Sequence, residues 1–161
     1  MQFTFHTLDV FTNRRFGGNP LAVVLDADHL SAEQMQTITR EFNLSETTFV
    51  MKPVDPANTA KVRIFFPTAE TSFAGHPTLG TAILLAEMRN LTEIRFELKA
   101  GLTPVKITKF GELYSGVFTA PVVPFHVDIK IPSIEETAQA LNLKIEDIGF
   151  DGHEIAVTEG G

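Results

Sequence analysis

The chain has 161 residues, of which 43% are hydrophobic and 20% charged, a composition typical of a globular protein with a buried core. Its formal net charge of -7 argues against nucleic acid as the main partner, because phosphate binding needs a basic surface. The sequence contains no cysteine, which excludes disulfides, thiolate nucleophiles and cysteine-bound metals.

The first 120 residues have the pattern of an α+β domain, with strands wrapped around a helix. Ser31 and Gln34 form a capping-box pattern that starts a helix ending near Phe42. Residues 78–88 (TLGTAILLAEM) predict a second helix, with Pro77 in its first turn. We expect a turn at residues 101–104. Runs of β-branched and aromatic residues predict strands at 3–10, 21–26, 47–51, 61–66, 94–99, 105–110 and 113–118.

The character of the chain changes near residue 120. Prolines at 121, 124 and 132 indicate a linker, and Ser133 with Glu136 repeats the capping-box pattern before a short helix ending near Leu141. We therefore predict a first domain at residues 1–120. We interpret residues 121–161 as a linker and the truncated beginning of a second, similar domain.

A candidate anion site lies at the start of the second predicted helix, in residues 73–80 (FAGHPTLG). The first N–H groups of a helix lack intrahelical partners and attract negative charge, so this end suits a carboxylate. Gly75 allows close approach of a ligand, and His76 can donate a hydrogen bond or relay a proton. The alternative is that Gly75 shapes the loop and His76 caps the helix, and the spacing does not decide between them.

Glu46 is the candidate acid/base residue, within residues 43–50 (NLSETTFV). A carboxyl group at a cavity edge beside apolar residues can give and take a proton near neutral pH. The alternative is a solvated turn glutamate, since most glutamates are exposed. Residues 16–20 (FGGNP) precede a predicted strand and not a helix, so we exclude nucleotide binding and interpret them as a structural turn that packs beside the active-site loop.

The sequence gives no motif for a metal or an organic cofactor. The other histidines are scattered without the spacing of metal ligands, and no nucleophile-elbow motif is present. No apolar run reaches the ~18 residues of a membrane span, and the N-terminus lacks a signal-peptide pattern. We expect no cofactor, no metal, no membrane contact and a cytoplasmic location.

Three segments, in this order, resemble the phenazine-biosynthesis (PhzF-like) isomerase family. They are residues 16–24 (FGGNPLAVV), 43–50 (NLSETTFV) and 73–80 (FAGHPTLG). The resemblance implies the diaminopimelate-epimerase fold, in which two similar domains each wrap strands around a central helix. Residues 82–86 would then lie on the central helix of the first domain.

The same resemblance implies roles for individual residues. Glu46 would move a proton between carbons of a small anionic substrate resembling a dihydro-hydroxyanthranilate, without a cofactor. His76 would assist in catalysis, and the substrate would be held by Ser45, Gly75, His76 and Pro77. The early end of the chain would leave only half of the active-site cleft, so activity of this chain alone is open.

Two other functions remain open. An amino-acid racemase or epimerase would need a second base, such as His76. A non-catalytic binding or assembly module would have kept only the first domain. In each case an exposed apolar cleft face favours self-association, and we expect a dimer.

Overall fold

The computed structural model describes residues 2–160, which divide into two compact units. The first unit ends at Pro121 and the second begins at Val122. That the second unit is the beginning of another domain stays a prediction. No helix in the described residues is long and apolar enough to cross a membrane.

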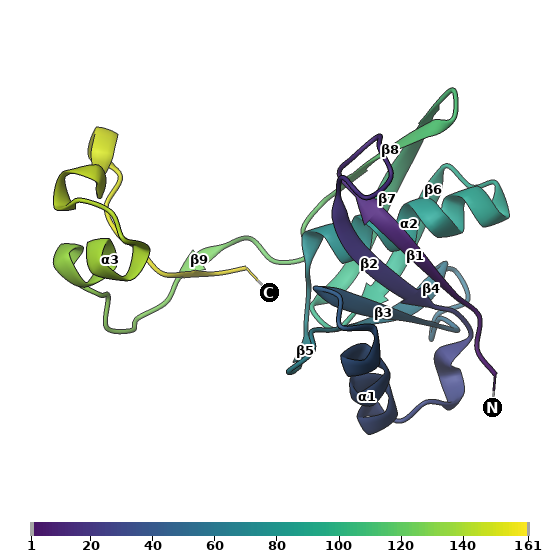
Figure 1. Ribbon diagram of the computed structural model, residues 1–161. Coiled ribbons are helices and arrows are strands. Elements are labelled where there is room, and N and C mark those ends of the chain that lie inside the picture. The colour runs from purple at the N-terminus through teal and green to yellow at the C-terminus, as the bar shows by residue number, and fades with distance from the viewer. Residues whose placement is uncertain (1, 161) are drawn as a thin grey trace. The chain divides into compact units, whose positions relative to one another are not determined.

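A mixed sheet of eight strands builds the first unit (Figure 1). The strands are β1 (Phe5–Val10), β2 (Asn19–Val24), β3 (Glu46–Met51), β4 (Ala60–Phe65), β5 (Glu70–Thr71), β6 (Glu93–Leu98), β7 (Gly101–Phe110) and β8 (Leu113–Phe118). Their order in the sheet is β1-β2-β3-β4-β6-β7-β8, and β5 pairs with β4. The neighbours β2–β3 and β4–β6 are parallel, whereas the other pairs are antiparallel.

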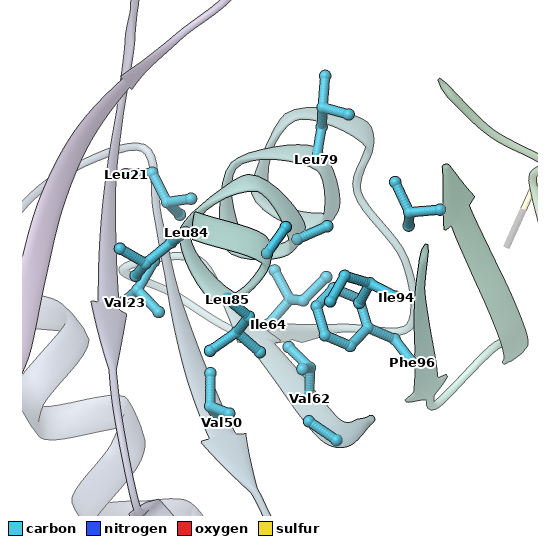
Figure 2. Packing of buried hydrophobic residues seen from close by; sticks show 14 of the residues in the cluster. Leu21, Val23, Val50, Val62, Ile64, Leu79, Leu84, Leu85, Ile94 and Phe96 are labelled. Atoms are coloured by element: carbon cyan, nitrogen blue, oxygen red, sulfur yellow. The ribbon is translucent and has the colours of Figure 1, made fainter. Parts of the chain in front are cut away.

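The sheet curves around helix α2 (Gly75–Arg89), which confirms the prediction of strands wrapped around a helix (Figure 1). The helix is buried on nearly all sides from His76 to Ala86, because it is apolar around most of its circumference. Figure 2 shows Leu84 and Leu85 of α2 among inward-pointing side chains of the strands, including Phe96 and Ile64. Residues 82–86 therefore lie on the central helix.

Helix α1 (Ala32–Phe42) packs on the other face of the sheet, against β3 and β4. Met35 of this helix is fully buried in a second apolar cluster with Phe49 and Phe65. The predicted capping box is confirmed: the Ser31 hydroxyl accepts from the Gln34 N–H, and the Gln34 side chain accepts from the Ser31 N–H.

Several predicted boundaries are wrong, including that of the strand predicted at 21–26, which is β2 and runs from Asn19 to Val24. Helix α2 begins at Gly75 and not after Pro77, because the Thr78 N–H and hydroxyl both donate to the Ala74 carbonyl and close a first turn upstream. Strand β7 begins at Gly101, so residues 101–104 are not a turn. Pro104 fits within β7 because only β6 pairs with the strand at that point, and its missing N–H breaks no ladder.

The second unit is small. It contains α3 (Ile134–Leu141) and an antiparallel pair of two-residue strands, β9 (Phe125–His126) and β10 (Thr158–Glu159). The predicted capping box at Ser133 and Glu136 is confirmed, with each residue's backbone N–H donating to the other's side chain.

Candidate active site

Glu46 is placed by the junction between α1 and β3. Asn43 ends α1 in the left-handed conformation (φ 49°), and β3 begins three residues later with Glu46. Because β2 and β3 are parallel, with Leu21 opposite Glu46, the beginnings of both strands lie at one edge of the sheet. The Glu46 side chain is only 12% exposed, so it is not a solvated turn carboxylate.

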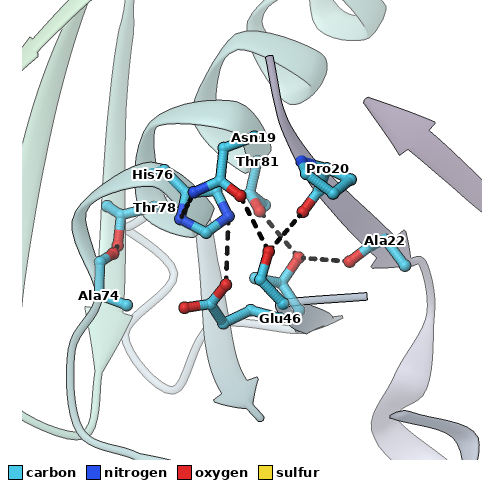
Figure 3. Close-up of polar contacts among 10 residues, drawn as sticks. Asn19, Pro20, Ala22, Glu46, Ala74, His76, Thr78 and Thr81 are labelled. Atoms are coloured by element: carbon cyan, nitrogen blue, oxygen red, sulfur yellow. Dashed lines mark hydrogen bonds and ion pairs between the residues drawn. The ribbon is translucent and has the colours of Figure 1, made fainter. Parts of the chain in front are cut away.

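His76 lies in the first turn of α2 and points at Glu46 (Figure 3). Its side chain is 8% exposed, and its Nε2 atom is 3.3 Å from Glu46 Oε2. The two atoms are at ion-pair distance, but neither makes a hydrogen bond. Buried polar atoms without hydrogen bonds are rare in native proteins and often mark a functional group. Glu46 and His76 are 30 positions apart in the sequence, and the fold brings these two predicted residues together.

The opposite side of the His76 ring contacts Asn19. Asn19 Nδ2 is 3.1 Å from His76 Nδ1, and Asn19 Oδ1 accepts from the Ser45 hydroxyl at 2.9 Å. The Ser45 hydroxyl is also 3.1 Å from the Pro20 carbonyl oxygen. Ser45 therefore contacts the site through Asn19, a residue that the sequence indicated only as part of a structural turn.

A pair of buried hydroxyl groups joins β3 to α2. Thr48 follows Glu46 by two positions and so lies on the same face of β3. Its Oγ1 is 2.8 Å from the Oγ1 of Thr81 on α2, and both residues are fully buried. This contact ties the strand that carries Glu46 to the helix that carries His76.

The start of α2 has free N–H groups of the kind that attract negative charge. The N–H groups of Gly75 and His76 open the helix and have no intrahelical acceptor. Phe73 and Phe118 form an edge-to-face pair with ring centroids 5.6 Å apart, and Phe118 lies 3.6 Å from the position of a Cβ atom added to Gly75. Pro77 is buried in the first turn and has no N–H to donate.

Gly18 is required where the β1–β2 hairpin passes close to its own backbone. A Cβ atom added at Gly18 would overlap the Val10 carbonyl oxygen and lie 2.6 Å from Thr12 Cγ2. Because the hairpin must shift to relieve this overlap, we expect Gly18→Ala to lower the free energy of unfolding by about 1–3 kcal/mol in urea denaturation. Gly17→Ala is the control, since the nearest atom to its Cβ is the end of the Thr12 side chain at 3.2 Å, and the Arg14 carbonyl oxygen lies at 3.4 Å, an ordinary contact distance. Equal losses in the two variants would contradict the explanation.

Glu70, in the two-residue strand β5, is paired with Arg63. The Arg63 guanidinium donates two hydrogen bonds to the Glu70 carboxylate, at 2.7 and 2.9 Å, and Lys99 Nζ is 3.8 Å away. The hydrogen bonds from Arg63 lower the pKa of Glu70, against the opposing effect of burial. Glu70 is thus a structural residue of β5.

This ion pair predicts a pH dependence of stability. Because the pKa of Glu70 is lower in the folded protein, its contribution is complete above the ordinary value of 4.5 and is lost as the pH falls through the folded pKa. We expect Glu70→Gln to reduce the free energy of unfolding at pH ~7 by up to about 1 kcal/mol, and to have little effect at pH ~3. Urea denaturation at both pH values measures this. A loss of the same size at both values would show that charge is not the cause.

The described residues offer no metal centre. Within residues 2–160, no group of three or more His, Asp or Glu side chains is arranged to hold a metal ion. The polar atoms of the site instead come from a carboxylate, an imidazole, an amide, a hydroxyl and a helix start. These are groups that bind an organic anion and move protons.

The curved sheet around α2, with this carboxylate–imidazole pair at its edge, defines an epimerase-like domain with a candidate acid/base site. Residues 8–161 match the family profile of phenazine biosynthesis-like proteins (PhzC-PhzF). The chain belongs to this family, as its three motifs indicated.

Similar proteins agree with this membership. An uncharacterized isomerase of Mesorhizobium japonicum is 40% identical over 95% of this chain and 51% of its own length. The trans-2,3-dihydro-3-hydroxyanthranilate isomerase of Pseudomonas aeruginosa is 43% identical over 63% of this chain and 36% of its own length. The solved structure of a predicted epimerase from Pseudomonas aeruginosa is 29% identical, with a TM-score of 0.85 over 99% of this chain and 57% of that one. The expected epimerase-like fold is confirmed, and the chain spans about half the length of the curated relatives it matches.

Proposed function

We propose that this chain carries the acid/base site of an isomerase that shifts a proton on a small carboxylate substrate without a cofactor. The observation that supports it most is the Glu46–His76 pair, whose facing atoms are buried, 3.3 Å apart and free of hydrogen bonds. In apo enzymes, catalytic contacts are often long and tighten only around the substrate.

The proposed reaction needs one base that also returns the proton. The Glu46 carboxylate removes a proton from a substrate carbon, and the electron pair of the broken C–H bond shifts along an adjacent double bond. The resulting Glu46 carboxylic acid then protonates a different carbon, which restores the carboxylate and leaves an isomer of the substrate. His76 donates a hydrogen bond to the negative charge that develops between the two transfers.

The start of α2 is the proposed anchor for the substrate carboxylate. The free N–H groups of Gly75 and His76 attract negative charge within reach of the His76 ring. The Phe73–Phe118 pair beside Gly75 offers an apolar wall for an unsaturated ring. We propose trans-2,3-dihydro-3-hydroxyanthranilate, which the name of the Pseudomonas aeruginosa relative contains, as the representative substrate, and refer to it as the test acid.

A racemase is less well supported by this geometry. Inversion at one carbon by two bases requires the bases on opposite faces of that carbon. Glu46 and His76 instead lie in contact with each other, 3.3 Å apart, so they do not face each other across a substrate carbon.

Turnover of the test acid in deuterated water distinguishes these functions. We expect an isomer with deuterium at the newly protonated carbon, detected by mass spectrometry and NMR. We also expect the amide signals of Gly75 and His76 to shift on titration with the test acid. Deuterium at Cα with inversion would indicate a racemase. The proposal would be contradicted if the test acid were not turned over and the two amide signals did not shift.

A further inference from the structure

Asn19 contacts the His76 ring on the side that faces away from Glu46. Its Nδ2 atom lies 3.1 Å from His76 Nδ1, whereas Glu46 Oε2 lies 3.3 Å from Nε2 (Figure 3). The histidine ring is therefore held between an amide and a carboxylate, one on each nitrogen.

Ser45 sets the orientation of the Asn19 amide. The Ser45 hydroxyl has one proton and two acceptors in range, Asn19 Oδ1 at 2.9 Å and the Pro20 carbonyl oxygen at 3.1 Å. When the proton lies in the shorter contact, Oδ1 of Asn19 faces Ser45 and Nδ2 faces the histidine. An amide –NH₂ group can only donate, so Nδ1 of His76 must be the acceptor. A neutral imidazole with an accepting Nδ1 carries its proton on Nε2. The Nε2–H group then lies beside Glu46, with Nε2 at 3.3 Å from Oε2 and no hydrogen bond between them in this structure.

We propose that Asn19 is a positioning residue that holds neutral His76 in the Nε2–H form. Resting on the proposed function, this gives His76 an Nε2–H group that donates to the substrate, and leaves Glu46 as the base. His76 cannot act as a base at Nε2 while Asn19 donates to Nδ1, because Nε2 then carries the proton. A ring protonated on both nitrogens would set its Nδ1–H against the Asn19 –NH₂ group.

The fold explains how Asn19 reaches this position. Asn19 is the first residue of β2 and Glu46 the first of β3, and these parallel strands are adjacent in the sheet. Ser45 therefore lies beside Asn19 and the Pro20 carbonyl, and α2 brings His76 to the same edge. The glycine-rich turn before Asn19 thus places a polar side chain as well as shaping the hairpin.

The test compares Asn19→Asp with the unmodified chain. The aspartate has nearly the same shape, but its carboxylate accepts where the amide donates. NMR of protein labelled with ¹⁵N at histidine, at mildly alkaline pH, reports which ring nitrogen of His76 carries a proton. Because free histidine also favours the Nε2–H form, the decisive result is the change between the two proteins. Asn13→Asp is the control, since it adds the same charge in the same hairpin loop at an exposed position.

We expect the unmodified chain and Asn13→Asp to show a protonated Nε2 and an unprotonated Nδ1. We expect Asn19→Asp to show a protonated Nδ1, and Asn19→Ala, which removes both donor and acceptor, to lie between them. A protonated Nδ1 in the unmodified chain, or an Nδ1 that stays unprotonated in Asn19→Asp, would overturn the inference.

The proposed function is judged by a different measurement, the deuterium turnover of the test acid. A His76 signal that responds to Asn19→Asp without turnover supports the role of Asn19 and counts against the function. Turnover with a His76 signal that does not respond to Asn19→Asp supports the function and counts against the role of Asn19.

Discussion

Glu46→Gln is expected to lower the rate of deuterium incorporation into the product by about 10²–10⁴-fold, the usual contribution of general acid–base catalysis. Glutamine has nearly the same shape as glutamate but cannot take up a proton from carbon. The Glu46 side chain is 12% exposed and faces His76. A glutamine side chain of the same shape fits the same space. Because binding at the start of α2 does not involve Glu46, the titration shifts of the Gly75 and His76 amides are expected to remain.

Glu41→Gln is the matched control for this experiment. Glu41 lies five positions before Glu46 and is exposed on α1, so its charge is removed without touching the site. We expect its rate to match that of the unmodified chain. A Glu46→Gln variant that still exchanges at the full rate would remove Glu46 from the proposed reaction.

Local rules of sequence predicted much of the fold. The capping boxes at Ser31 and Ser133 place the starts of α1 and α3 because their hydrogen bonds join residues three positions apart. The start of α2 could not be found in this way, because Ala74 at its N-cap has no side-chain cap. That helix is stabilised by its burial inside the sheet, which depends on residues far away in sequence.

The candidate site was predicted only in part, again because one of its contacts joins residues that are far apart in the sequence. Glu46 and His76 lie in motifs with a resemblance to a known family, whereas the interpretation of Asn19 as a turn residue missed its contact with His76. That contact joins residues 57 positions apart, and it forms because α2 packs against β2 in the folded chain. An Asn–Pro pair is a turn signal in any sequence, so nothing local marked Asn19 as a partner of the histidine.

The stability of the site depends on the packing around α2. The Glu46–His76 distance joins a strand to a helix, and the buried Thr48–Thr81 contact maintains the same connection. Both contacts exist only while α2 stays seated in the curved sheet. A substitution in the core below the helix therefore tests the support of the site without altering any of its polar groups.

Phe96→Ala is expected to destabilise the first unit by about 3–5 kcal/mol, the usual loss for a buried phenylalanine. Phe96 is fully buried on β6, in the cluster that surrounds α2 (Figure 2). Its removal leaves a cavity that neighbouring strands fill only in part, since both β4 and β7 pair with β6 beside it. Against a total stability of typically 5–15 kcal/mol, this loss is a large fraction. Urea denaturation followed by circular dichroism measures it.

Phe110→Ala makes the same chemical change at a position on β7 that is 63% exposed. We expect it to change the free energy of unfolding by less than about 0.5 kcal/mol, because a surface substitution leaves no cavity. If the two variants unfold at the same urea concentration, Phe96 is not part of the packing that seats α2. If Phe96→Ala alone unfolds early and also loses the His76 ring signals of the native site at lower urea, the helix and the site are lost together. That result would tie the acid/base geometry to the core, because the packing around α2 positions the helix that carries His76.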